Sequence, residues 1–501
     1  MKGLSYKKVF SKYSVSLSSN LSRVAYSSYK KVRIGVSKKF PLKEYERNSF
    51  EDHRFRDDTS TDMPLGFNFS TQENEDGYLN IEYIDFYDYL PKEDLDIFKK
   101  SIRKFVSKNK PAPFGPYRTV EDLDRIDNMG RYVDFGSFYN LYVVKLIRNE
   151  YLEKFSSQVA VSLMNLSASF LVVKYRFYIT GNFNEKVNEI CKRKHLSYTD
   201  VSRQFNIPWY KPQKFGRVKY TGDDARYKEL YTLVSTLKWK AFSELKRYFR
   251  VYFEYNQLFP PTFDTYSTNI RPSSSRETRE FWYSVMLGFH TDYAPKYNAC
   301  VCWDYECSQY EGKRLSAYCG GNYTNTDHLP EIAKHDISDI YANYLTASSM
   351  RRIAERDIAI CNRRISKAIR RAKTSQVLKV RVSVEKKLYY SYRFISEFTG
   401  DTIDHDDGME FRSSFIKDGS TTSSCLKGIA KNTAETKKQI DNLLKILDDA
   451  AEYGSTKSNL SLQWFMMVVT VLSLIVAIAA IFDLELSDLK TLWNVFSDFM
   501  R

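Results

Sequence analysis

The sequence lacks the short motifs that mark the most common nucleotide-binding, hydrolase and metalloprotease sites. It contains no G-x-x-x-x-G-K-S/T, no G-x-G-x-x-G, no G-x-S-x-G and no H-E-x-x-H. These absences exclude P-loop nucleotide hydrolysis and the common hydrolase and zinc-protease routes, although they leave other kinds of enzyme open. No internal repeat or low-complexity array is present. The sequence therefore favours a non-enzymatic role without deciding the question.

A secretory signal is missing as well, because residues 1–40 contain no apolar stretch. The 7 cysteines are an odd number, and a cytosolic, reduced body with free thiols is the expectation that follows. The first 43 residues contain no Asp or Glu and are rich in Ser, which is also the composition of an organellar targeting peptide. Their apolar face is poor and most of their basic residues are Lys. The sequence therefore favours a basic arm over residues 1–50, followed by a polar linker over 51–77.

Two basic blocks account for the net charge of +15. Residues 1–50 contain 12 Lys/Arg and 2 Asp/Glu, and residues 351–390 contain 13 Lys/Arg and 3 Asp/Glu, so each block carries +10 and the remainder −5. Such blocks favour binding to the phosphates of anionic lipid or nucleic acid. A solvated arm, or pairing with acidic surfaces of the same chain, is the alternative. The predicted contact residues are Lys7, Lys8, Lys30, Lys31, Arg363, Arg364, Arg370 and Arg371.

Residues 459–482 contain no charged side chain. A helix of about 20 residues crosses the hydrocarbon core of a bilayer, which is about 30 Å thick. Thr470 and Ser473 are the only polar side chains in its inner part, and Trp464 stands at one end, where indole rings prefer the membrane interface. A transmembrane helix is therefore predicted over residues 460–482. The residues expected to face the bilayer include Trp464, Val468, Leu472, Ile475, Ile478 and Phe482.

The charges that flank this segment predict its orientation. Lys445 and Lys457 precede it, whereas the first charged residues after it are Asp483 and Glu485. Basic flanks stay on the cytosolic side of a membrane, so the bulk of the chain is expected in the cytoplasm. The remaining residues, 483–501, have helical apolar spacing and are predicted to form a short amphipathic tail in the outer interface.

Residues 421–457 carry apolar and Thr side chains at alternating spacings of three and four. This is an a/d repeat over about four heptads, and charged or amide residues fill most other positions. Such a narrow stripe is typical of a coiled-coil stalk that joins several copies, and the alternative is a helix folded against its own domain. A short break is expected at Gly454-Ser455. The predicted oligomerisation residues are Leu426, Ile429, Ile440, Leu443, Leu447 and Ala450.

A basic helical region is predicted over residues 346–400. Apolar residues at helical spacing indicate a first helix over Ser349–Thr374. Val377–Glu385 alternates apolar with charged residues and is interpreted as a strand or a helix break. A second helix is expected over Tyr389–Phe398, and the two helices are expected to pair as an antiparallel hairpin.

The central part of the chain mixes helical and strand patterns, which predicts an α+β body. We expect one large domain or two lobes, 78–260 and 276–345, that meet at a loop over residues 259–275. Helices are predicted over Pro91–Lys108, Asn182–Arg193 and Tyr227–Tyr252, and strands over Leu141–Ile147, Ala168–Thr180, Phe281–Gly288 and Ala299–Gln309.

Four of the cysteines and three histidines are concentrated in residues 290–335. Thiolates and imidazoles in this number can hold a tetrahedral Zn²⁺, although the spacing C-x-C-x4-C-x11-C is not that of a known zinc knuckle. Residues 299–303 have the pattern of a strand buried on both faces, in which free cysteines act as small apolar side chains. Core thiols are therefore favoured. The candidate zinc ligands are Cys300, Cys302, Cys307 and Cys319.

The predicted architecture is an α+β cytosolic body followed by long helices and one C-terminal transmembrane helix. This layout resembles that of bacterial membrane-anchored sensors and effectors, including those of phage defence. We therefore expect an oligomeric sensor or effector whose body binds a ligand or partner and acts through the membrane. A membrane-tethered metal-dependent enzyme and a nucleic-acid-binding module held at the membrane are the alternatives.

Overall fold

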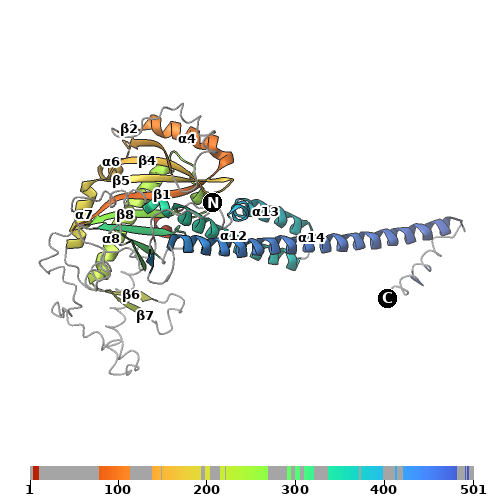
Figure 1. The fold of residues 1–501 in the computed structure, drawn as a ribbon. Coiled ribbons are helices and arrows are strands. Elements are labelled where there is room, and N and C mark those ends of the chain that lie inside the picture. The colour runs from red at the N-terminus through yellow and green to blue at the C-terminus, as the bar shows by residue number, and fades with distance from the viewer. Residues whose placement is uncertain are drawn as a thin grey trace, which may run out of the picture. The chain divides into compact units, whose positions relative to one another are not determined.

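The structure is a computed structural model of the 501-residue chain (Figure 1). The chain forms two compact units, a sheet unit of residues 1–353 and 394–433 and a helical unit of residues 354–393 and 434–501. The structure describes residues 4–10, 78–112, 138–147, 149–192, 198–203, 215–220, 222–268, 290–294, 299–304, 310–320, 337–371, 374–398, 412–413, 421–481, 491 and 494–495.

A mixed sheet of ten strands runs through the sheet unit in the order β12-β9-β10-β11-β8-β1-β5-β4-β3-β2. All neighbouring strands in this sheet are antiparallel except β8 and β11, which are parallel. A separate two-stranded sheet pairs β6 with β7. The strands are β1 Leu79–Pro91, β2 Lys110–Pro111, β3 Tyr139–Lys145, β4 Ser156–Asn165, β5 Phe170–Ile179, β6 Tyr198–Arg203, β7 Phe215–Tyr220, β8 Thr262–Thr268, β9 His290–Ala294, β10 Ala299–Asp304, β11 Arg314–Gly320 and β12 Arg412–Ser413.

Helices from separate parts of the sequence accompany this sheet and form the helical unit (Figure 1). The described helices are α1 Tyr6–Val9, η3 Lys92–Asp94, α4 Leu95–Lys108, α6 Glu150–Phe155, α7 Gly181–Lys192, α8 Gly222–Leu245, α9 Tyr252–Tyr255, α12 Ala342–Arg371, α13 Thr374–Glu397 and α14 Thr421–Ile481. The α+β class predicted from the sequence is therefore confirmed, and the strand predicted over 281–288 lies outside the described residues.

The prediction of a loop over residues 259–275 is wrong for Thr262–Thr268. These residues form β8, a central strand between β1 and β11. Pro260 and Pro261 and the many Thr, Asp and Ser residues of this segment are typical of turns. Neighbouring strands and helices nevertheless bury every residue of β8. Tertiary pairing thus overrides local propensity, and strands from both predicted lobes belong to one sheet.

The first described residues of the basic arm pack into the sheet unit. The ring of Phe10 is 1% exposed and lies edge-on to Phe259 at 5.1 Å and to Tyr231 at 6.3 Å. Tyr6 contacts Trp239 of α8 in the same way at 6.1 Å. Cleavage of a targeting peptide after these residues would remove Phe10 from the core, so the contacts favour its retention.

Polar contacts connect α12, α13 and α14 within the helical unit. Asp357 Oδ1 lies 2.9 Å from Lys387 Nζ, and Arg364 donates to Ser383 Oγ at 3.1 Å, so α12 and α13 form the predicted antiparallel hairpin. The strand or break predicted over Val377–Glu385 is wrong, because α13 is helical throughout. Its Val384 is fully buried, and packing of this face outweighs the low helix propensity of β-branched residues.

The predicted oligomerisation residues Ile440, Leu443 and Leu447 are buried within a single chain, each at 4% exposure or less. Such burial is what a helix folded against its own domain predicts, and a coiled coil between copies is not shown. The other members of the predicted seam are Ile429, which is buried, Ala450, which is half-buried, and Leu426, whose side chain lies outside the described residues.

The helix α14 continues without interruption through Gly454-Ser455, so the break predicted there is wrong. A glycine in a helix interior costs only about 1 kcal/mol. Ending the helix would leave four carbonyl groups without partners, which is the larger loss. One helix therefore connects the buried residues near Leu443 to the apolar segment that begins at Leu460.

The apolar end of α14 is long and hydrophobic enough to span a membrane. Its most apolar 18-residue window has a mean hydropathy of 2.1, and none of that window is buried. A core helix of a soluble protein would be mostly buried, and a signal sequence would lie near the N-terminus. The exposed fractions include 60% for Trp464, 66% for Phe465 and 38% for Leu472. Of the other residues predicted to face the bilayer, Val468 and Ile475 are of intermediate exposure, whereas the side chains of Ile478 and Phe482 lie outside the described residues.

Candidate functional site

A buried ion pair connects two central strands of the large sheet. Asp85 of β1 and Arg176 of β5 are direct cross-strand partners, so both side chains project from the same face. Arg176 donates from Nε to Asp85 Oδ1 at 2.8 Å and from Nη2 to Oδ2 at 2.9 Å. The pair is bidentate, and Asp85 is 0% exposed.

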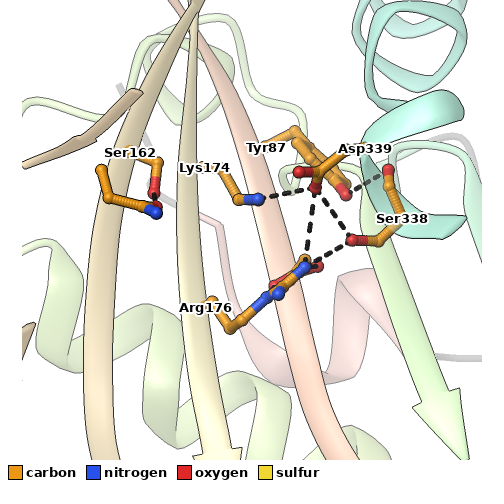
Figure 2. Close-up of polar contacts among 8 residues, drawn as sticks. Tyr87, Ser162, Lys174, Arg176, Ser338 and Asp339 are labelled. Carbon is orange, nitrogen blue, oxygen red and sulfur yellow. Dashed lines mark hydrogen bonds and ion pairs between the residues drawn. The ribbon is translucent and has the colours of Figure 1, made fainter. Parts of the chain in front are cut away.

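The segment that leads into α12 joins this ion pair (Figure 2). Arg176 Nη2 donates to Ser338 Oγ at 2.6 Å and lies 3.6 Å from Asp339 Oδ1. Lys174, two residues earlier on the same face of β5, donates to Asp339 Oδ1 at 2.6 Å. The hydroxyl of Tyr87 donates to the Ser338 carbonyl oxygen at 2.8 Å. We refer to Asp85, Tyr87, Lys174, Arg176, Ser338 and Asp339 as the sheet–α12 network.

Burial governs the ionisation of the sheet–α12 network. Burial lowers the pKa of Lys174, and the charge of Arg176 lowers it further, while Asp339 opposes both effects. Burial also lowers the pKa of Arg176, but the contacts with Asp85 outweigh it and hold that pKa well above its usual value. Burial raises the pKa of Tyr87, which stays neutral. In this arrangement Arg176 pairs with Asp85 and Lys174 pairs with Asp339.

Aromatic rings cover both cations of the network. The Arg176 guanidinium lies 4.0 Å from the ring centroid of Tyr83, and Lys174 Nζ lies 4.0 Å from that of Phe138. A cation over an aromatic face is attracted by the ring quadrupole, and the attraction grows as water is removed. These rings further fix the positions of the two charges.

The C-terminal end of α13 is held to the same sheet by Glu397. Its Oε2 accepts hydrogen bonds from Ser167 Oγ and from the Ser169 backbone N–H, both at 2.8 Å, and the Ser169 hydroxyl donates to Oε1. These serines lie in the turn between β4 and β5. The ring of Phe394 meets Phe170 edge-on at 6.2 Å. The start of α12 and the end of α13 are thus both anchored on the sheet.

Each acidic or basic side chain of the sheet–α12 network has a partner of the opposite kind. Removing one partner of a buried ion pair lowers the stability of the fold far more than removing both partners does. Because Asp339 precedes α12 and Glu397 ends α13, these contacts connect both ends of the hairpin to the sheet.

A second buried ion pair occupies the opposite face of the sheet. Asp264 follows Phe263, the cross-strand partner of Asp85, and successive side chains of a strand point to opposite faces. Lys238 Nζ of α8 lies 2.6 Å from Asp264 Oδ2 and donates to Thr262 Oγ1 at 2.9 Å. Burial lowers the pKa of Lys238, and Asp264 opposes that effect. This pair fixes α8 on β8.

The strand register separates the candidate zinc ligands. Cys300 is the cross-strand partner of Tyr318, whereas Cys319 is that of Ala299, so Cys300 and Cys319 project from opposite faces. Cys302 shares the face of Cys300, and all three side chains are at most 1% exposed. This register separates Cys319 from Cys300 and Cys302, and a metal site built from the four predicted cysteines stays an untested prediction. The described residues contain no group of three or more His, Cys, Asp or Glu that could hold a metal ion, and Cys307 lies outside them.

The predicted lipid- or nucleic-acid-binding residues are described in part. Lys8 is exposed, with Nζ 5.7 Å from the Tyr310 ring centroid. Arg363 and Arg364 are exposed on α12. The remaining positions are Lys30 and Lys31, which lie outside the described residues, and Lys7, Arg370 and Arg371, which are helical but whose side chains are not described. Their binding partners stay predictions.

The sheet–α12 network was missed in the sequence because its members are far apart along the chain. Asp85 and Arg176 are separated by 91 residues, and Arg176 and Ser338 by 162. One local signal existed. Charged residues interrupt two strongly apolar strand patterns, at Asp85 and Asp88 in the first and at Lys174 and Arg176 in the second. A charge within a buried strand requires a partner, which is what the fold supplies.

No protein-family model matches this chain, and no curated protein is detectably similar to it. The function must therefore be inferred from the arrangement of the chain's own residues.

Proposed function

We propose that this chain is a single-span membrane protein whose sheet unit works in the cytoplasm as a sensor or effector domain. One observation carries the proposal. The helix α14 is part of the core near Leu443, yet its apolar end is unburied throughout the window that the structure describes. Exposed apolar surface costs about 25 cal/mol per Å² in water, and a bilayer removes that penalty.

The flanking charges support the orientation. Lys457 precedes the apolar end of α14, and the helical unit adds the basic hairpin of α12 and α13, whereas Asp483 and Glu485 follow the span. Basic residues stay on the cytoplasmic side. The sheet unit would then lie in the cytoplasm, with residues 483–501 on the far side of the membrane.

The anchoring of α12 and α13 on the sheet supports the sensor or effector role. A ligand or partner that binds the sheet unit would change the contacts of Asp339 or Glu397 and thereby the position of the hairpin, which contacts α14 through Arg381 and Asp448 at 2.9 Å. Association of several copies remains a prediction. Mass photometry of the full chain in detergent measures it directly, and particles of one-chain mass at every concentration would contradict it.

Two Lys substitutions test the membrane span. The change Leu472→Lys with Val476→Lys places two charges near the middle of the apolar segment, at about 2.5–3.5 kcal/mol each for insertion. The matched control, Ile446→Lys with Tyr453→Lys, alters exposed apolar residues of the same helix. We expect the wild type and the control to stay in the membrane pellet after alkaline carbonate extraction.

The span variant is expected in the soluble or aggregated fraction after the same extraction. Release of the wild-type chain by carbonate without detergent would contradict the proposal. Equal release of the span variant and the control would contradict it too, because the effect would then not depend on bilayer insertion.

A further inference from the structure

The segment that contains the end of α12 and the start of α13 is strongly basic. Residues 363–379 contain seven Lys/Arg and no Asp or Glu. Within this segment, which we call the hairpin tip, the described side chains of Arg363, Arg364, Lys367 and Lys379 are all exposed. Seven like charges in 17 residues repel one another and attract an anionic partner.

The hairpin tip lies at the level of α14 residues that shortly precede its apolar end. Following the chain, α12 enters the helical unit after Ile353 and α13 leaves it before Phe394. The helix α14 enters it after Thr433. Counted from there, Arg381 is 13 residues along α13 and Asp448 is 15 along α14, and their side chains meet at 2.9 Å. The two helices therefore advance in step, and Figure 1 shows α14 continuing beyond the hairpin.

The same count places the tip close to the expected membrane surface. The ends of α12 and α13 at the tip, residues 371 and 374, are 18 and 20 residues into the helical unit, level with about residue 453 of α14. From there, Leu460 and Trp464 are about 10 and 16 Å further along the helix at 1.5 Å per residue. The headgroup layer takes up about 5–8 Å of this distance. The remainder is about one Debye length at physiological salt, roughly 8 Å, and long Lys and Arg side chains extend across it.

We propose that the hairpin tip docks on anionic lipid headgroups of the cytoplasmic leaflet. This inference rests on the proposed membrane span, which brings the tip to the bilayer. The docking would fix the hairpin against the membrane surface while its other ends are anchored on the sheet. The hairpin would thus be held at one end by lipid and at the other by Asp339 and Glu397.

Among the residues that the structure describes, the ion pairs of the nearby acidic side chains lie outside the tip. Asp357 of the hairpin is paired with Lys387, and Asp448 of α14 is paired with Arg381, both outside the tip. Within the part of the chain that the structure describes, no acidic side chain forms an ion pair with Arg363, Lys367 or Lys379. The charge of the tip is therefore left for a partner, and the nearest anionic surface to a membrane-anchored helix is the leaflet itself.

Lysine footprinting tests the docking. The full chain is reconstituted in phosphatidylcholine vesicles with and without phosphatidylserine and labelled with a membrane-impermeant amine reagent. Mass spectrometry reads the labelling rates of Lys367 and Lys379 relative to Lys431, far from the span. We expect phosphatidylserine to lower the labelling rates of the two tip lysines roughly fivefold. This factor corresponds to about 1 kcal/mol, the binding free energy of one basic residue near an anionic surface. High salt should remove the difference.

Matched variants identify the groups responsible. The change Arg370→Gln with Arg371→Gln should abolish most of the lipid effect on Lys367 and Lys379, whereas Lys437→Gln with Lys438→Gln removes the same charge from α14 and should leave it intact. Equal labelling rates in both kinds of vesicle would overturn the docking. So would equal protection by free phosphate or by RNA on phosphatidylcholine vesicles. Carbonate extraction of the same vesicles tests the membrane span separately. A failure of the span can therefore be distinguished from a failure of the docking.

Discussion

The sheet unit and the helical unit differ in what they bury and what they expose: the first buries charged side chains, and the second exposes large apolar ones. The sheet unit places complete ion pairs in its core, with the side chains of Lys238 and Asp264 at 1% and 0% exposure. The helical unit leaves the large apolar side chains of Trp464 and Phe465 at 60% and 66% exposure. A buried charge is tolerated when an opposite charge meets it, and exposed apolar surface when the surrounding solvent is not water.

The contrast is sharpest within the single helix α14. Leu447 is fully buried, its neighbour Ile446 is 46% exposed, and Leu474, about four heptads further along the helix, is 60% exposed. A helix in water shows one apolar stripe, as the first part of α14 does, whereas its last part is apolar all round. The change of pattern along one helix marks the expected change of solvent.

The largest expected effect comes from breaking the buried ion pair of Lys238 and Asp264. The change Lys238→Met leaves a buried carboxylate without its partner and should lower the free energy of unfolding by about 3–5 kcal/mol. The double change Lys238→Met with Asp264→Leu should recover most of that loss, because it removes both charges. Denaturant unfolding in detergent measures both. A single variant within 1 kcal/mol of wild type, on the order of a surface pair, would contradict the contrast between units.

Neighbouring residues of α14 test whether the predicted seam is a core of one chain. The change Leu447→Ala should destabilise the chain by about 2–5 kcal/mol, because it opens a cavity among buried side chains. The change Ile446→Ala at the exposed neighbour should stay within about 0.5 kcal/mol. The comparison uses unfolding of the purified chain at several concentrations. A Leu447→Ala effect that disappears on dilution would instead indicate a seam between copies.

Asp88 predicts a pH dependence in the sheet unit. It is 2% exposed, and burial raises its pKa from 3.8 to about 7, although it accepts hydrogen bonds from the backbone N–H groups of Tyr252 and Phe253. The folded state therefore binds this proton more tightly than the unfolded state does. The resulting stability is complete below pH 4 and is lost as the pH rises through 7, with a slope of up to about 1.4 kcal/mol per pH unit.

The variant Asp88→Asn should lack this contribution to the pH dependence of the unfolding free energy. Unfolding measured between pH 4.5 and 7.5 should show wild-type stability falling relative to the variant as the pH rises. The matched control is Asp448→Asn, which removes an exposed carboxylate of the helical unit. Parallel curves for wild type and Asp88→Asn would contradict the expected titration.

The smallest effect is expected at the exposed ion pair of the helical unit. Arg381 and Asp448 are 40% and 53% exposed, so water screens their interaction and side-chain entropy opposes it. The change Arg381→Ala should lower the free energy of unfolding by less than about 1 kcal/mol, and the loss should shrink in high salt. A loss comparable to that of Lys238→Met would remove the difference between buried and exposed pairs.

The sequence was most informative where a single pattern extends over many residues. The span, α4, α7 and α12 follow from apolar spacing, since each buries or exposes one continuous face, whereas only the last part of α13 was predicted as a helix. Short segments were misjudged where partners distant in sequence decide the structure. Thr262–Thr268 has the composition of a turn, yet it becomes a central strand between two others, and Lys238 of α8 neutralises its Asp264.

The candidate site was less accessible to sequence reasoning than the fold. The partners of Arg176 lie on β1 and before α12, and no spacing rule connects residues so far apart. The cysteine cluster shows the converse, since closeness in sequence suggested a zinc site. The register of β10 and β11 places Cys300 and Cys319 on opposite faces of the sheet instead.

Labelling from within the lipid phase tests the membrane insertion of α14 directly. A photoactivated carbene reagent that partitions into the hydrocarbon core is added to membranes that contain the full chain, and the adducts are mapped by mass spectrometry. We expect adducts concentrated in residues 464–481 and none in the strands β1 and β5. Residues 464–481 without adducts, or labelled no more than the sheet, would contradict a bilayer-embedded α14.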